Sequence, residues 1–91
     1  MTWQLIYTEQ YIRKAAKFIK QHPDALKQYA KTLELLEVNP HHPSLRLHHL
    51  MGKLAGLQSV SINLQYRITL DMIVTDQEII LVNVGDHDQV Y

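Results

Sequence analysis

The sequence predicts an α+β domain with the element order β-α-α-β-β-β, in which a helical hairpin packs on one face of a mostly antiparallel sheet. Two observations predict this fold class. Between residues 8 and 38 the apolar side chains recur at helical spacing, whereas between residues 59 and 85 they alternate with polar ones as in strands. An irregular stretch, residues 40–56, separates the two parts and holds two prolines and two glycines.

The first half of the chain is expected to form one strand and two helices. Residues 3–7, WQLIY, suit a short strand, and Thr8 followed by Glu9 supplies a helix N-cap and a first-turn carboxylate. The stretch QHPD at 21–24 ends this helix and starts a second one, which Asn39–Pro40 stops. The side chains expected to face the core are Ile12, Ala15, Ala16 and Ile19 in the first helix, and Leu26, Tyr29, Ala30, Leu33 and either Leu36 or Glu37 in the second.

The second half of the chain is expected to form three strands. Residues 59–62 and 66–72 alternate polar with apolar side chains, and residues 63–65 suit a turn between them. A second turn at 75–77 leads to residues 78–85, which are apolar enough for a strand covered on both faces.

Size and composition indicate one compact domain that spans residues 1–91. The chain has 91 residues, of which 46% are hydrophobic and 20% charged, and it has no low-complexity run. At this length a chain buries only about 60–65% of its unfolded surface, so a deep pocket has little room. We therefore expect any active site to be a shallow groove.

The absence of cysteine excludes disulfides and thiolate chemistry, and it is compatible with a reducing compartment. No apolar run approaches the roughly 18–20 residues of a membrane span. We expect a cytoplasmic protein that does not associate with membranes.

The formal net charge of zero argues against a simple nucleic-acid binder but hides an asymmetry along the chain. Residues 1–67 hold all nine Lys and Arg against four acidic residues, a balance of +5, while residues 68–91 hold five acidic residues and no Lys or Arg. A local positive face therefore stays compatible with overall neutrality.

Histidines form the first candidate site, since four of the six lie within residues 41–50. A zinc or nickel ion needs three or four converging ligands, but adjacent histidines rarely bind one ion together and the i, i+4 helical spacing is missing. We expect no metal here, and we expect His41 and His42 to be solvated loop residues.

Two further candidates lie in the predicted strands and at the C-terminus. Arg67 points away from the apolar stripe of its strand, and its planar guanidinium suits a phosphate; the alternative is a cross-strand ion pair with Asp71 or Glu78. His87 stands between two aspartates, an environment that raises an imidazole pKa and suits a general acid. The alternative is an exposed tail that ends in a packed Tyr91.

Three segments, HHLMGKLAG at 48–56, SINLQYRITL at 61–70 and ILVNVGDHDQVY at 80–91, resemble the RelE/ParE superfamily of toxins from toxin–antitoxin systems. The resemblance is greatest to the RelE-type and YafQ-type ribosome-dependent mRNA interferases. It includes a Leu-x-Gly-x-Leu-x-Gly segment, a Tyr-Arg-hydrophobic strand and a Gly-x-His end, matched here by 50–56, 66–68 and 85–91.

The resemblance implies a RelE-like microbial RNase fold and an endoribonuclease that cleaves mRNA in the ribosomal A site. In this family a ribose 2′-OH attacks the adjacent phosphate and leaves a 2′,3′-cyclic phosphate, a reaction that needs a base, cationic donors and an acid but no metal or cofactor. The implied partners are the ribosome with its mRNA and a cognate antitoxin that holds the toxin inactive.

Matched position by position, the resemblance assigns Arg67 to the phosphate and His87 to acid or base catalysis. His48 is the preferred partner base, with His49 as the alternative. The residues implied to contact RNA are Lys53, Tyr66 and Tyr91.

The chain also departs from the YafQ pattern. A strand histidine is replaced near Ser61, and the acidic residue that follows it appears as Gln65, so Arg67 and His87 would carry more of the mechanism. The alternative function is a non-catalytic or ParE-like toxin that inhibits DNA gyrase, also neutralised by an antitoxin. Because gyrase poisons of this fold commonly lack the terminal histidine, His87 favours RNA cleavage.

Overall fold

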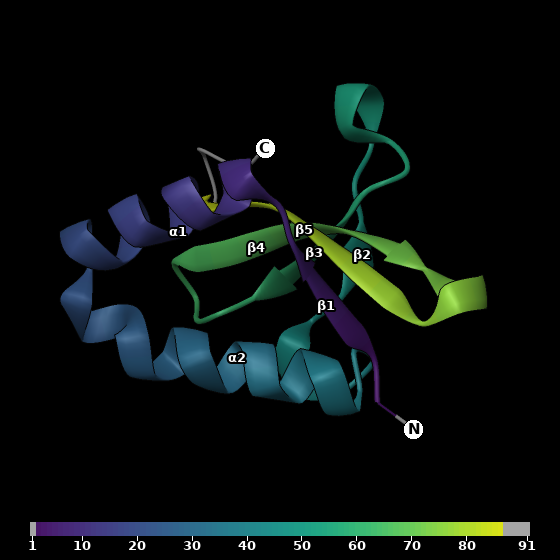
Figure 1. The fold of residues 1–91 in the computed structure, drawn as a ribbon, viewed down its shortest axis with the longest axis horizontal. Coiled ribbons are helices and arrows are strands. Elements are labelled where there is room, and N and C mark those ends of the chain that lie inside the picture. Colours follow the sequence, from purple (N-terminus) through teal and green to yellow (C-terminus); the bar gives the residue numbers. More distant parts are fainter. Residues whose placement is uncertain (1, 87–91) are drawn as a thin grey trace.

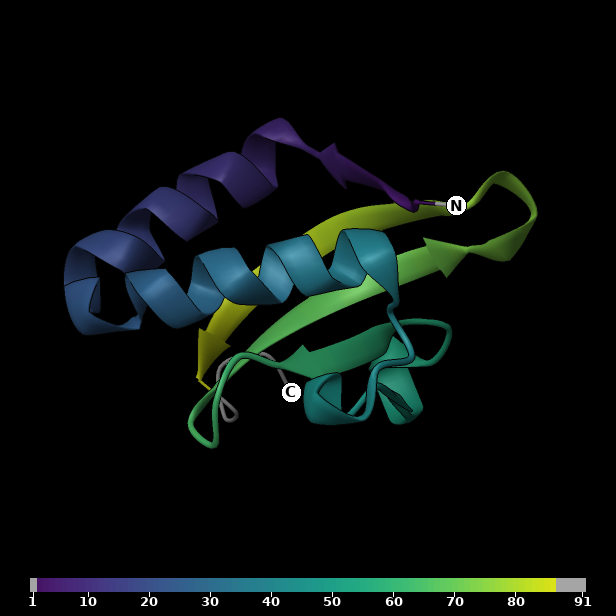
Figure 2. The same ribbon diagram turned by 90° about the horizontal axis from the view of Figure 1, so that it is seen from below.

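The computed structural model describes residues 2–86 and confirms the α+β fold class, with two helices side by side on one face of a sheet (Figures 1 and 2). The strand order is β1-β5-β4-β3-β2, in which β1 runs parallel to β5 and the other neighbours are antiparallel. The elements are β1 Gln4–Tyr7, α1 Glu9–Gln21, α2 Leu26–Val38, β2 His48–His49, β3 Gln58–Ser61, β4 Tyr66–Ile73 and β5 Glu78–Asp86, joined by 3-10 turns at Pro23–Ala25 (η1), Pro43–Leu45 (η2), Gly52–Leu54 (η3) and Val74–Asp76 (η4).

Strand β2 corrects the expectation that residues 40–56 are irregular throughout. His48 pairs with Ser59 and His49 with Gln58 at the edge of the sheet. Two residues are too short to show a period in the sequence, so only the pairing with β3 reveals this strand.

Helix α1 begins and ends where the sequence predicts, but its buried face was predicted only in part. The Thr8 side chain accepts a hydrogen bond from the Tyr11 amide at 3.1 Å and caps the helix. The buried residues are Tyr11, Ala15 and Phe18, whereas Ile12 is 54% exposed. The two large rings fill the space above the sheet, so the helix is rotated toward them by about one position.

Helix α2 shows the same kind of shift. Tyr29 and Leu36 are buried as expected, but Leu26 is 48% exposed and Thr32 takes a core position instead. The Thr32 hydroxyl donates to the Gln28 carbonyl at 2.8 Å, which satisfies this polar group inside the core.

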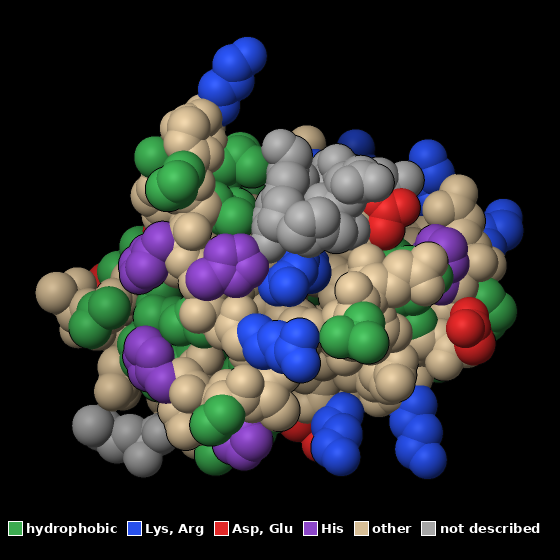
Figure 3. All heavy atoms as spheres, turned by 180° about the vertical axis from the view of Figure 1, so that it is seen from behind, with side chains coloured by type: hydrophobic (Ala, Val, Ile, Leu, Met, Phe, Trp, Pro, Cys, Tyr) green, Lys and Arg blue, Asp and Glu red, His purple; other side chains and the backbone are tan. Residues whose placement is uncertain are grey.

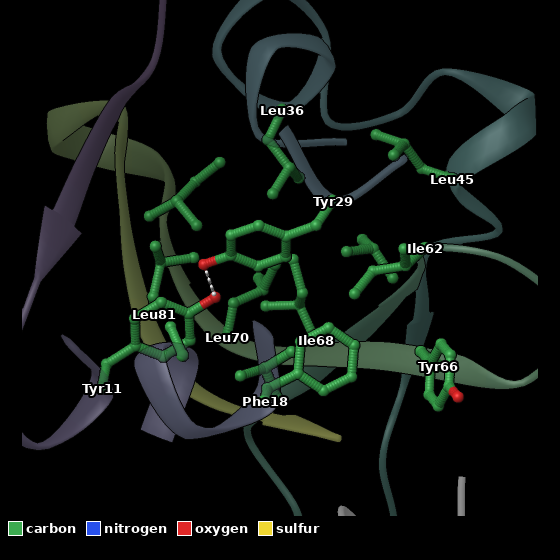
Figure 4. Packing of buried hydrophobic residues seen from close by; sticks show 14 of the residues in the cluster. Tyr11, Phe18, Tyr29, Leu36, Leu45, Ile62, Tyr66, Ile68, Leu70 and Leu81 are labelled. Carbon is green, nitrogen blue, oxygen red and sulfur yellow. Dashed lines mark hydrogen bonds between the residues drawn. The ribbon is translucent and has the colours of Figure 1, made fainter. Parts of the chain in front are cut away.

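The core lies between the two helices and β3, β4 and β5 (Figure 4). At its centre the hydroxyls of Tyr11 and Tyr29 lie 2.9 Å apart and hydrogen-bond to each other. The sheet contributes fully buried residues such as Ile68 and Leu81. The hydrogen bond between Tyr11 and Tyr29 joins α1 to α2 and lets two polar groups lie in an apolar environment.

None of the helices within residues 2–86 is long and apolar enough to cross a membrane.

Candidate nucleic-acid interface

Strand β4 presents different side chains to the two faces of the sheet. Tyr66, Ile68 and Leu70 point into the core and are at most 7% exposed. Because successive side chains of a strand point to opposite faces, Arg67 and Thr69 point to the face away from the helices. We call this side of the sheet the open face because both helices lie on the other side (Figure 2); the side chains of Thr69 and Ser59 are nevertheless buried there.

The strand register determines which histidine of β2 shares the open face with Arg67. Directly opposed residues of an antiparallel ladder point to the same face. His48 is opposite Ser59, and Ser59 is opposite Thr69, so His48 lies on the open face. His49 is opposite Gln58, whose other neighbour is the core residue Leu70, so His49 lies on the helix side.

One strand, β3, lies between His48 and Arg67, so the two residues are two inter-strand spacings apart across the sheet and two positions apart along it. This spacing places their Cα atoms about 12 Å apart. Both side chains are long enough to approach a ligand that lies between them. Seen from the side away from the helices, histidine side chains gather beside Lys and Arg side chains (Figure 3).

The hydrogen bonds of the two β2 histidines indicate opposite tautomers. His48 Nδ1 lies 3.2 Å from the Arg46 carbonyl oxygen, which can only accept, so in the neutral ring Nδ1 carries the proton and Nε2 is the basic nitrogen. Gln58 accepts from the Met72 amide through Oε1 at 3.1 Å, which fixes the orientation of its amide group. Its Nε2 therefore donates to His49 Nδ1 at 3.3 Å and occupies the basic nitrogen of that ring.

Arg67 is half-buried on the open face and has no protein partner within residues 2–86. Its Nη1 atom is buried without a hydrogen bond, and the possible cross-strand pairs with Asp71 and Glu78 are not formed. An exposed ion pair joins Arg13 and Glu9 on the surface of α1 at 3.8 Å. The Arg67 charge is therefore unneutralised by the described residues and suits an anionic ligand.

The Leu-x-Gly-x-Leu-x-Gly segment forms a loop that projects from the end of the sheet, drawn in teal in Figure 1. The Leu50 amide donates to the Leu57 carbonyl at 3.0 Å and closes the loop. Gly52 and Gly56 have φ of 70° and 97°, a region that glycine adopts more readily than other residues. The backbone conformation of the loop therefore explains why glycine occupies both positions. Lys53 lies in η3 near the tip and is exposed.

Tyr66 has a structural role on the core side of β4, and its implied RNA contact stays a prediction. It is 7% exposed, and its hydroxyl lies 3.0 Å from His22 Nδ1. Its ring packs edge-on against Phe18 with centroids 5.0 Å apart. A ring held in this way on the core side of β4 has little exposed surface, so a contact between Tyr66 and RNA is a prediction that the variant Tyr66→Phe tests.

The remaining candidate residues do not converge within the described chain. His41 and His42 are exposed as expected, and the His42 ring accepts from the Ser44 amide at 3.2 Å at the start of η2. His87 and Tyr91 lie outside the described residues. Over residues 2–86 no group of three His, Cys, Asp or Glu is placed to hold a metal ion.

A shallow hollow of about 330 Å³ lies between α1 and β5 and carries positive charge. Asn83, which lines it, is also opposite Thr69 in the ladder between β4 and β5. The hollow therefore adjoins the sheet beside the open face. Its lining residues are Lys14, Lys17, Phe18, Gln21, His22, Asn83 and Val84.

The sequence matches no protein-family model and no curated protein. Its fold, however, matches solved structures over nearly the whole chain. The Escherichia coli DinJ–YafQ toxin–antitoxin complex gives a TM-score of 0.78 at 17% identity, covering 100% of this chain and 99% of that chain. The chain has the fold of the RelE/ParE toxins.

Two further structures with this fold agree. YafQ from Escherichia coli strain BL21(DE3) gives a TM-score of 0.72 at 16% identity, with 98% of each chain covered. The RelBE2 toxin–antitoxin complex from Mycobacterium tuberculosis gives 0.70 at 19% identity, covering 96% of this chain and 100% of that chain. The predicted RelE-like fold is confirmed, and at these identities the likeness extends to the fold alone.

Proposed function

We propose that residues 1–91 form a single-domain toxin of a type II toxin–antitoxin system, which acts in the cytoplasm as a ribosome-dependent endoribonuclease on mRNA. The observation that carries this proposal is Arg67, a half-buried guanidinium on the open face with no partner among residues 2–86. A cation held on a strand and left without a partner suits the charge that develops on a phosphate during transfer.

The proposed reaction is an attack of a ribose 2′-OH on the adjacent phosphorus. His48 Nε2 takes the 2′-OH proton, the O2′–P bond forms, and the bond from phosphorus to the 5′-oxygen breaks. His87, which lies outside the described residues, gives a proton to the leaving 5′-oxygen. The products are a 2′,3′-cyclic phosphate and a free 5′-OH, and no metal or cofactor is needed.

Contacts with RNA extend the proposed site beyond the reacting atoms. Lys53 on the exposed loop is proposed to contact the phosphate backbone, and Tyr91 to place the RNA at the end of the chain. His49 is kept as the alternative base, although its basic nitrogen already accepts from Gln58.

The proposed protein partner is a cognate antitoxin. Two of the structures with this fold are toxin–antitoxin complexes, as their names state. A helix or strand that covers the open face would bury Arg67 and His48 and block access of the RNA.

Cell-free translation with the purified protein tests the proposed function. We expect protein synthesis to fall and mRNA to be cut in the A site, with cuts mapped by primer extension. Arg67→Ala should lower the cleavage rate by about 10²–10³-fold, the usual loss for one charge-stabilising donor. Arg13→Ala, which removes an exposed arginine of α1, is the matched control and should cleave normally.

Intact mRNA and undiminished synthesis would contradict the RNase function. A second experiment expresses the protein in growing cells. If growth stops while mRNA stays intact and DNA supercoiling is blocked, gyrase inhibition replaces the RNase function.

A further inference from the structure

Two buried side-chain polar atoms within residues 2–86 lack a hydrogen-bond partner, and they belong to residues two positions apart in one strand. They are Arg67 Nη1 and Thr69 Oγ1, which point to the same face of β4. Buried polar atoms are nearly always bonded, and an unbonded one destabilises the fold, so each exception needs an explanation. Two such exceptions at adjacent positions of one face suggest a common cause.

Packing alone does not explain a threonine at position 69. Its side chain is 2% exposed, and valine has the same shape without the hydroxyl. The directly opposed neighbours of Thr69 in the two ladders are Asn83 of β5 and the buried Ser59 of β3. In α2, the buried Thr32 gives its hydroxyl a carbonyl partner, whereas Thr69 has none in the described chain.

We propose that Thr69 and Arg67 together bind one oxyanion, a phosphate of the RNA. The Thr69 hydroxyl donates to one phosphate oxygen and Arg67 Nη1 donates to the same phosphate. This inference rests on the proposed function for the identity of the ligand. It adds a ligand-binding residue to the site that the sequence analysis did not single out.

The geometry allows one phosphate to contact both residues. Side chains two positions apart in a strand start about 6.8 Å from each other, and the longer Arg67 side chain can fold back toward Thr69. The guanidinium can change its rotamer without breaking a hydrogen bond to any residue from 2 to 86. The guanidinium is therefore free to turn toward a phosphate that binds beside Thr69.

Thr69→Val and Thr69→Ser test the inference. Thr69→Val removes the hydroxyl and keeps the shape, while Thr69→Ser keeps the hydroxyl. The matched control is Thr32→Val, which removes a buried hydroxyl that does have a partner. All four proteins are titrated by NMR with a short 2′-O-methyl RNA, which lacks the attacking hydroxyl, and the wild type also with inorganic phosphate and acetate.

For Thr69→Val we expect RNA binding to weaken while the stability of the fold stays the same or increases. Thr69→Val should melt at or above the wild-type temperature yet bind the RNA at least tenfold more weakly, as for a lost hydrogen bond to a charged group. Thr69→Ser should bind within about threefold of wild type. Thr32→Val should melt lower and bind normally. In the wild type, phosphate should shift the Thr69 and Arg67 signals, and acetate should shift them less.

Three outcomes would overturn the inference: wild-type protein that binds neither RNA nor phosphate, a Thr69→Val protein that binds like wild type, or Thr69→Ser and Thr69→Val proteins that lose binding equally.

The proposed function is tested separately with translating ribosomes. If Thr69 is needed for binding but mRNA stays intact, the RNase function fails and the anion site stands. If wild type and Thr69→Val cleave and bind equally, the anion site fails and the function stands.

Discussion

Arg67 and Tyr66 are neighbours in the sequence, but their side chains lie on opposite sides of the sheet. Tyr66 packs against Phe18 and hydrogen-bonds to His22 on the helix side, while Arg67 stands without a partner from the described chain on the open face. The Tyr-Arg pair therefore combines a structural residue with a candidate phosphate ligand. The alternation of side chains along β4 assigns these roles, because it turns each successive residue to the other face.

At the same scale, we expect the two adjacent histidines of β2 to differ in function. His48→Gln should lower the cleavage rate on translating ribosomes by about 10²–10⁴-fold, because His48 shares the open face with Arg67 and has Nε2 as its basic nitrogen. His49→Gln is the matched control and should cleave within a few-fold of wild type. Primer extension measures both rates. A larger loss in His49→Gln than in His48→Gln would assign the base to His49 instead.

At the scale of elements, two contacts position the candidate site. The bond between Tyr66 and His22 ties the turn after α1 to the start of β4. Gln58, which is 8% exposed, ties the edge strand β2 to β4 by donating to His49 and accepting from Met72. Gln58 thus adds a side-chain link to the two-residue ladder between β2 and β3 and helps hold His48 in register.

Tyr66→Phe separates the structural role of Tyr66 from a role in RNA binding. The variant keeps the ring and its packing but loses the hydrogen bond to His22, so the free energy of unfolding should fall by about 1 kcal/mol. Cleavage and binding of 2′-O-methyl RNA should stay at the wild-type level at temperatures where the variant is folded. Urea unfolding gives the stability. Strongly reduced RNA binding by a fully folded Tyr66→Phe protein would show that the hydroxyl contacts RNA after all.

At the scale of the whole molecule, the fold depends on contacts between distant parts of the chain. The first strand pairs in parallel with the last one, from Gln4 opposite Glu78 to Tyr7 opposite Leu81. The core then joins the two helices through Tyr11 and Tyr29. Burial raises the pKa of both tyrosines, and for Tyr11 the nearby Tyr29 raises it further.

These raised pKa values predict a loss of stability at high pH. In the unfolded chain tyrosine releases its proton near pH 10, whereas the folded chain retains it at Tyr11 and Tyr29. The stabilisation is thus fully present below about pH 10 and is lost as the pH rises above it, by about 1.4 kcal/mol per pH unit for each retained proton. Urea unfolding between pH 8 and 11 measures this dependence.

The control for the pH prediction is the double variant Tyr11→Phe with Tyr29→Phe. It removes both hydroxyls together, so no unpaired polar group is left in the core. Its stability should fall less steeply above about pH 10 than that of the wild type. Equal slopes would mean that the tyrosine pair does not keep its protons in the folded chain.

Local patterns in the sequence were sufficient to predict the type and order of the main elements. Helical spacing, the Thr8 cap and the turn residues depend on neighbours in the chain, and the structure places α1, α2, β1, β3, β4 and β5 close to the predicted ranges. The sequence also indicated that Arg67 faces away from the core. Each of these features is set by periodicity or by capping, which a sequence records directly.

Only the tertiary structure decided how the helices are rotated about their axes and which distant residues meet. The rings of Tyr11 and Phe18 set the rotation of α1, and pairing with β3 created β2 and turned His48, not His49, to the side of Arg67. That Thr69 lacks a hydrogen-bond partner within residues 2–86 is likewise a property of its surroundings. These outcomes depend on contacts between segments far apart in the sequence, so no local pattern could have predicted them.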